Sequence, residues 1–193
     1  MRRILMLMAL LAMLSTPSYG QNLDRDFVRT GVQESLVDSW RVLNGVTTAQ
    51  EFSGKVEVIV SGFGINVPGS GFLEDAFHGF LPSAPDEPAG TLPPVGLHIS
   101  FTGCSLSFEC GAPRIESLLL YVDGVGFVSP PDDTVEELRA TFPYSPQHVY
   151  RFVIDIGSTP QFLTLGHGDG GVADNEGFFH LQLFEVRAKG KRK

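Results

Sequence analysis

The sequence predicts an all-β protein, an antiparallel β-sandwich with at most one or two short helices. Short segments in which apolar and polar residues alternate recur along the chain, and this period of two is typical of strands with one buried face. Turn-forming residues separate the segments, and the 193 residues include 22 Gly and 13 Pro. Several segments have a polar face, as two packed antiparallel sheets require, so we expect a sandwich of the jelly-roll or Greek-key type.

Residues 1–20 have the pattern of a secretory signal peptide. Arg2 and Arg3 precede an apolar run at 4–14, which is too short to span a bilayer as a mature helix, and small residues follow it. The sequence contains no second long apolar run. We therefore expect an exported protein, secreted or periplasmic, with no transmembrane segment after residues 1–20 are removed.

Residues 21–50 are expected to form an N-terminal arm or short helix that leads into a first strand near Trp40. Apolar residues recur there at a spacing of four, as on one face of an amphipathic helix. These residues are Val28, Val32, Leu36 and Trp40.

The sandwich itself is expected to span residues 51–187. The proline-rich segment 82–94 is expected to be a stiff surface loop, because proline has no amide hydrogen for a central strand. Residues 134–139 are expected to form one helical turn, and the last three strands to lie side by side, joined by two turns. The expected strands lie near residues 56–60, 77–81, 97–101, 118–122, 150–156, 163–165 and 179–183.

The formal net charge of −8 argues against a nucleic-acid partner, since an acidic protein and the phosphate backbone repel each other. The basic tail at 188–193 is expected to be a solvated chain end, with attachment to an anionic surface as the alternative. Cys104 and Cys110 are the chain's two cysteines. In an oxidising compartment they most simply form a disulfide across a small loop; a reactive or metal-binding pair is the alternative.

The segment 166–177 contains the densest set of oxygen donors in the sequence. Asp169, Asp174 and Glu176 supply carboxylates and Asn175 supplies an amide, beside several glycines. Calcium takes six to eight oxygen ligands and tolerates irregular geometry, so the segment can supply much of a calcium site. The alternative is an ordinary turn, because turns use the same residue types.

The motif Asp-Asn-Glu-Gly at 174–177 leads directly into an aromatic strand and follows Asp169 in a glycine-rich segment. This order resembles the calcium-dependent galactophilic lectins of the PA-IL type and related secreted galactose-binding-like sandwiches. The resemblance implies a shared site in which sugar hydroxyls complete the coordination of calcium. The metal ligands that it implies are Asp169, Asp174, Asn175 and the carbonyl of Ala173.

Residues 58–62 resemble the strand before the first glycine-rich loop of that family. The histidine and glutamine that hold galactose in the family have no counterpart in residues 90–96, so the resemblance does not carry galactose specificity to this chain. His167 and Glu176, which flank the expected metal ligands, are candidate ligand-binding residues. We therefore expect a carbohydrate or another polyhydroxyl ligand.

The sequence lacks the common catalytic signatures, including the GxSxG elbow, HExxH and the P-loop. Glu74 and Asp75 lie close to His78, which would suit acid–base chemistry or a second face of the metal site; a polar strand entry is the alternative. His148 has no partner that the sequence reveals.

These observations predict a secreted, non-catalytic binding module for calcium and carbohydrate. Two alternatives stay open. The chain could be a structural or cell-envelope protein whose acidic segment is only a turn, or a hydrolase with a non-standard site.

Overall fold

The structure is a computed structural model of the chain. It describes residues 23–42, 45–65, 71–89, 97–101, 119–122, 126–128, 142–167 and 173–190. In these residues the fold is all-β, as predicted, with one four-residue helix, α1 (Leu23–Asp26), and strands that pair antiparallel throughout. No helix among the described residues has the length and apolar character to cross a membrane.

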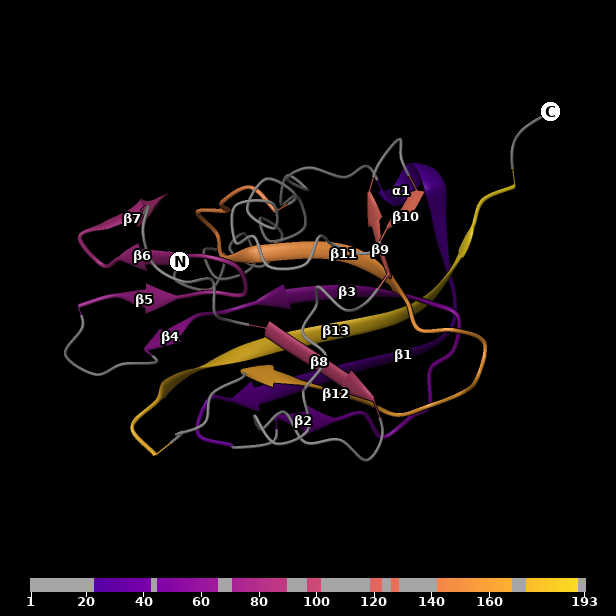
Figure 1. The fold of residues 1–193 in the computed structure, drawn as a ribbon, viewed down its shortest axis with the longest axis horizontal. Coiled ribbons are helices and arrows are strands. Elements are labelled where there is room, and N and C mark those ends of the chain that lie inside the picture. Colours follow the sequence, from indigo (N-terminus) through magenta and orange to yellow (C-terminus); the bar gives the residue numbers. More distant parts are fainter. Residues whose placement is uncertain are drawn as a thin grey trace, which may run out of the picture.

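The strands form two sheets (Figure 1). The larger has ten strands in the order β10-β9-β11-β3-β13-β4-β5-β6-β7, with β1 paired to β13; the smaller has the order β2-β12-β8. The strands are β1 (Phe27–Ser39), β2 (Val46–Thr47), β3 (Lys55–Ser61), β4 (Gly64–Ile65), β5 (Leu73–Glu74), β6 (Gly79–Leu81), β7 (Ala84–Pro88), β8 (Leu97–Phe101), β9 (Leu119–Val122), β10 (Gly126–Val128), β11 (Val149–Asp155), β12 (Leu163–His167) and β13 (Glu176–Ala188).

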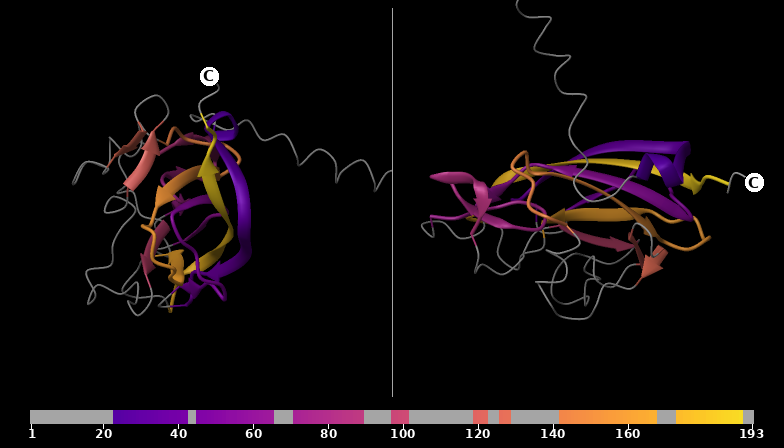
Figure 2. Two further views of the ribbon diagram at one scale, coloured as in Figure 1. Left: turned by 90° about the vertical axis from the view of Figure 1, so that its right-hand side faces the viewer. Right: turned by 90° about the horizontal axis from the view of Figure 1, so that it is seen from above.

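Strand β13 is the main support of the larger sheet. It pairs with β1 through most of its length and with both β3 and β4. The larger sheet is curled, and β8 and β12 lie on the other side of the core from β1, β3 and β13 (Figure 2). Apolar side chains of both sheets therefore share one core.

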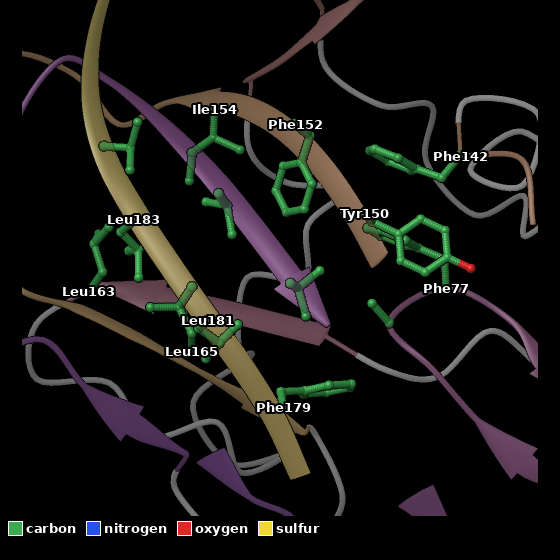
Figure 3. Packing of buried hydrophobic residues seen from close by; sticks show 14 of the residues in the cluster. Phe77, Phe142, Tyr150, Phe152, Ile154, Leu163, Leu165, Phe179, Leu181 and Leu183 are labelled. Carbon is green, nitrogen blue, oxygen red and sulfur yellow. The ribbon is translucent and has the colours of Figure 1, made fainter. Parts of the chain in front are cut away.

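The core forms because alternate residues of each strand point inward. Figure 3 shows side chains of β11, β12 and β13 directed toward one another. Each fully buried aliphatic or aromatic side chain of this kind contributes about 1.5–3 kcal/mol relative to an exposed one. The fully buried core residues on these strands and on β3 are Val56, Val58, Val60, Phe152, Ile154, Leu163, Leu165, Phe179, Leu181 and Leu183.

The prediction that a first strand starts near Trp40 is wrong, because β1 already starts at Phe27. A spacing of four is even, so it also places residues on one face of a strand. Val32 and Leu36 do pack against the core from that face. The register of β1 against β13 shifts between Arg29 and Gln33, and Val28, on the other side of this irregularity, is 37% exposed.

The last three strands do not lie side by side, which corrects a second prediction. Strand β3 lies between β11 and β13, and β12 belongs to the other sheet. Alternation in sequence fixes which face of a strand is buried, but it does not fix the neighbouring strand. Strands β12 and β13 therefore belong to different sheets and do not form a hairpin.

The proline-rich segment was predicted to be a surface loop, but its described part contains a strand, β7. β7 is the last strand in the order of the larger sheet, where proline is tolerated because one edge needs no partner. The helical turn expected at 134–139, the two cysteines of the expected disulfide and Asp169 lie outside the described residues, as do residues 1–20 and the end of the basic tail.

A smaller apolar cluster joins the N-terminal segment to the outer face of the larger sheet. It contains Leu23, Phe27, Val153 and Val186. Beside it, the buried carboxylate of Glu57 pairs with Arg29, at 2.6 Å, and with Arg151. These contacts hold the start of β1 in place.

We predict that Gly64→Ala destabilises the protein by about 1–3 kcal/mol, the usual cost of overpacking. A Cβ at Gly64 would lie 2.7 Å from Cε3 of Trp40 and still closer to the carbonyl oxygen of Glu176, so β4, β13 and the indole would have to separate. Urea unfolding measures the effect. Gly190→Ala is the control, because a Cβ there meets nothing within 4 Å; equal unfolding midpoints for the two variants would contradict the prediction.

Candidate functional site

A cluster of buried polar and aromatic residues lies where β1 and β12 end and β13 begins, at one end of the molecule (Figure 1). We call it the Trp40 cluster. Trp40 follows β1 directly and is fully buried. Its indole stacks on the imidazole of His167, with ring centroids 4.0 Å apart and the planes 5° from parallel, and it meets Phe179 edge-on. The members of the Trp40 cluster are Asp38, Trp40, His167 and Asn175.

Asn175 ties the start of β13 to the end of β1. Its side chain is fully buried, and Nδ2 donates to the carbonyl oxygen of Trp40 at 3.3 Å. The Trp40 amide in turn donates to the carbonyl oxygen of Gly177. Arg41 donates from Nε to the carbonyl oxygen of Asn175 at 2.9 Å, and its other end lies 3.5 Å from a carboxylate oxygen of Glu176.

Asp38 ties β1 to β12. Its side chain points inward from the strand and is 1% exposed, and Oδ2 accepts the backbone N–H of His167 at 2.9 Å. Gly166 allows this approach, since a Cβ there would lie 2.9 Å from the carboxylate and 2.7 Å from Cα of Gly45. Burial raises the pKa of Asp38 to about 6, although the hydrogen bond from His167 opposes the shift.

Among the described residues, Oδ1 of Asp38 and Nε1 of Trp40 are buried and have no hydrogen-bond partner. Such groups are uncommon, because a buried polar atom that loses water and gains nothing costs free energy. Asp38 and Trp40 are two residues apart on neighbouring inward positions, so one acceptor and one donor are left in the same region.

The structure brings together some of the residues predicted from the sequence and separates others. His167 and Asn175 meet at Trp40, whereas Ala173 and Asp174 are exposed. Glu176 is exposed as well and pairs loosely with Arg41. No three His, Cys, Asp or Glu side chains in the described part of the chain lie close enough together to hold a metal ion.

Asp38 and Trp40 were not among the predicted site residues. The helical interpretation of residues 28–40 concealed the signal, which is an acidic residue two positions before a tryptophan. On a strand these two residues share a face. An acidic residue on the inward face of a strand is unusual enough to indicate a site.

A second buried polar group surrounds Asp75, and we call it the Asp75 cluster. Asp75 is fully buried. Its Oδ1 accepts the backbone N–H groups of Phe77 and His78 at 2.9 and 2.8 Å. Its Oδ2 accepts the hydroxyl of Tyr150 at 2.8 Å and Nδ1 of His148 at 3.0 Å. The imidazole partner of Asp75 is therefore His148, which the sequence left without a partner, and not the ring of His78.

The Asp75 cluster has the chemistry of a structural anchor. The carboxylate of Asp75 accepts all four hydrogen bonds. The backbone of His148 is in a left-handed conformation, with φ of 53°, and its imidazole stacks on Phe80. The ring of His78 contacts the carbonyl oxygen of Phe142 at 2.6 Å, so Nε2 carries a proton. Burial and the neighbouring Asp75 raise the pKa of Tyr150, which keeps its hydroxyl a donor.

Comparison of the chain with protein-family models, with curated proteins and with solved structures finds no match. The resemblance to PA-IL-type lectins accordingly stays a prediction from the sequence.

We predict that Asp38 makes the metal-free protein less stable as the pH rises. The folded-state pKa of about 6 lies above the ordinary value of 3.8, so the neutral form favours folding. The contribution of Asp38 to the free energy of unfolding is fully present below pH 3.8, and about 3 kcal/mol of it is lost as the pH rises to 6 and above. Urea unfolding in the presence of a chelator should show that the free energy of unfolding of Asp38→Asn increases relative to that of the wild type across this range. If the difference between the two free energies of unfolding is constant between pH 4 and 7, the prediction is wrong.

We predict that Asp75→Ala destabilises the protein by about 3–5 kcal/mol, because it leaves four buried donors without their acceptor. Tyr150→Phe removes one of these hydrogen bonds and should cost about 1 kcal/mol. Asp86→Ala, on the exposed part of β7, is the control and should stay within about 0.5 kcal/mol of the wild type. Thermal and urea unfolding measure all three; a cost for Asp75→Ala as small as the control's would show that the cluster is not an anchor.

Proposed function

We propose that this chain is an exported, non-catalytic binding module, and that its ligand site lies at the end of the molecule formed by the Trp40 cluster. In this proposal the connection from β12 to β13 binds calcium, and the ion presents open coordination positions to the hydroxyl groups of a carbohydrate or another polyhydroxyl ligand. Export follows from the signal-peptide pattern of residues 1–20.

The observation that carries the proposal is that both ends of this connection are fixed on one tryptophan. His167, the last residue of β12, stacks on the indole of Trp40, and Asn175, just before β13, donates to the carbonyl oxygen of the same residue. An ordinary surface turn does not need a buried polar side chain at each end, because burial of polar groups costs free energy. Fixed ends reduce the entropy that a loop loses when it binds, which favours a binding site.

The available donors suit a hard cation. Asn175 supplies an amide oxygen and Asp174 an exposed carboxylate, and Asp38 supplies a buried carboxylate oxygen without a hydrogen-bond partner. Asp169 and the carbonyl of Ala173 stay predicted ligands. Oxygen donors of this kind favour calcium, and extracellular modules function with calcium dissociation constants on the order of 10⁻⁴–10⁻³ M.

A second candidate is a structural protein that binds another protein through the outer face of β1 and β13. Val37 is 58% exposed and Phe178 is 47% exposed on this face. Val37 lies opposite His180 in the β1–β13 pairing, and the ring centroids of Phe178 and His180 are 4.9 Å apart. Exposed apolar neighbours of this kind mark contact surfaces in some proteins.

We predict that calorimetric titration with calcium gives a binding heat for the wild type and that Asp174→Ala reduces it strongly, because the variant removes a charged ligand. Asp86→Ala, which removes an exposed carboxylate elsewhere, should bind as the wild type does. A glycan array that responds with calcium and falls silent with chelator would support the carbohydrate ligand.

The same titration separates the two candidates. If millimolar calcium gives the wild type no binding heat, the binding-module proposal fails and the structural candidate is favoured. Hydrolysis of a panel of ester and glycoside substrates by the wild type would favour the hydrolase alternative.

A further inference from the structure

Three of the six large apolar side chains that are exposed in the described part of the chain lie together on the outer face of the larger sheet. This side of the sheet is turned away from β8 and β12 (Figure 2). We call the surface the Phe178 face. Its members are Val37 and Ser39 of β1, Ser61 of β3, Phe63, which follows β3, and Phe178 and His180 of β13.

Strand pairing brings these members together around β13. The pairs across it are Ser39 with Phe178, Val37 with His180, and His180 with Ser61. The amide of Phe178 donates to the carbonyl oxygen of Phe63 at 3.4 Å, so these two phenylalanines are neighbours as well. Opposite residues of neighbouring strands share a face, as do residues two apart on one strand. The face points outward, because Phe179, between Phe178 and His180, is fully buried on the other side.

The Phe178 face carries no Asp, Glu, Lys or Arg, although 19% of the chain's residues are of these types. Charged side chains border it at both ends, and there they are paired with each other. Arg41 pairs with Glu176 at one end, and Arg151 pairs with Glu57 at the other. A charged ligand would therefore find no complementary group between these pairs, which favours a neutral ligand.

Neighbouring rings hold the two phenylalanines in position. Phe63 meets Phe80 and His148 edge-on, with ring centroids 5.5 and 5.1 Å apart, and 43% of its surface stays exposed. Phe178 meets His180 in the same way at 4.9 Å. Side chains that are already restricted lose less entropy when a ligand covers them, so both rings are suited to binding.

Hydrogen-bonding groups lie beside these rings. The side-chain polar atoms of Ser39, Ser61 and His180 have no hydrogen-bond partner among the described residues. Aromatic rings pack against the apolar C–H face of a sugar ring, and hydroxyl and imidazole groups bond to sugar hydroxyls. Ligand sites commonly combine aromatic side chains with a few polar groups in this way.

We propose that the Phe178 face binds an uncharged polysaccharide without a metal ion, with sugar rings packed on Phe63 and Phe178. The outer side of a curled sheet cannot enclose a small ligand, so an extended chain of sugars fits it better than a single sugar (Figure 2). This inference rests on the proposed function for its carbohydrate ligand, and it differs from it in the site and in requiring no calcium.

A protein partner, which the structural candidate assigns to part of this face, fits less well. A standard protein interface buries about 800 Å² on each partner, around a core that is depleted in polar groups. On the Phe178 face the three apolar side chains alternate with two serines and a histidine.

Affinity electrophoresis tests the inference directly. The wild type runs in native gels that contain hydroxyethyl cellulose, soluble starch, dextran or galactomannan, with EDTA or with calcium. We expect at least one of these polysaccharides to retard it equally under both conditions. Phe178→Ala should weaken the affinity at least about tenfold, because it removes a stacking ring. Phe178→Tyr keeps the ring and should bind as the wild type does.

Leu81→Ala is the matched control, because it truncates an exposed apolar side chain of β6, outside the Phe178 face. It should be retarded as the wild type is. Phe178 is exposed, so Phe178→Ala should keep the fold, and circular dichroism checks this. If that variant does not fold, Phe63→Ala takes its place, and the same loss of affinity is expected.

The outcomes separate this inference from the proposed function. Retardation that requires calcium and persists in Phe178→Ala would overturn the inference and leave the calcium-dependent module standing. If none of the four polysaccharides retards the wild type, the inference is wrong, and the calcium titration still decides the proposed function. If sedimentation shows a wild-type dimer that Phe178→Ala dissociates, the face binds a second copy of the chain and the inference is also wrong.

Discussion

The packing of Trp40 between the two sheets is the constraint on which the candidate site depends. Its indole is fully buried, stacks on His167 of the smaller sheet and meets Phe179 of the larger one. Its backbone groups bond to Gly177 and to the side chain of Asn175. A single residue thus positions the end of β12 and the start of β13. Gly64 lies against the same indole and leaves no room for a side chain, which fixes the position of β4 as well.

Two buried aspartates show how similar burial leads to different roles. Asp75 accepts four hydrogen bonds, and it joins the turn at residues 75–78 to β11, far along the chain. Asp38 accepts one hydrogen bond, from the backbone N–H of His167, and its other carboxylate oxygen accepts none from the described residues. A carboxylate whose acceptor capacity is used by the protein stabilises the fold, whereas a buried carboxylate with unused acceptor capacity lowers stability. The difference follows from the neighbours of each carboxylate and not from its depth.

Much of the fold could be predicted from the sequence because alternation of apolar residues is a local property. Strands β3, β8, β9, β11, β12 and β13 lie where the pattern placed them. The pattern failed at β1, because residues spaced by four share a face on a helix and on a strand alike. It also failed to predict how the final strands pair, because β11 pairs with β3, about 90 to 100 residues earlier in the chain, and with β9. No local signal in the sequence records such partners. Of the candidate site, His167 and Asn175 were predicted, and Asp38 and Trp40 were not.

The sequence by itself determined the all-β character, the sign of the charge and the concentration of oxygen donors before the last strand, since each depends on composition or on neighbouring residues. Only the tertiary structure decided that His167 and Asn175 both contact Trp40, the first through the indole and the second through the backbone carbonyl oxygen. It also decided that Asp174 is exposed while Asn175 is buried, and that Asp38 bonds to the backbone of His167. The physical reason is that the pairing of β1 with β13 joins segments about 140 to 160 residues apart. Their contact depends on how the two sheets share one core, and no stretch of sequence contains that information.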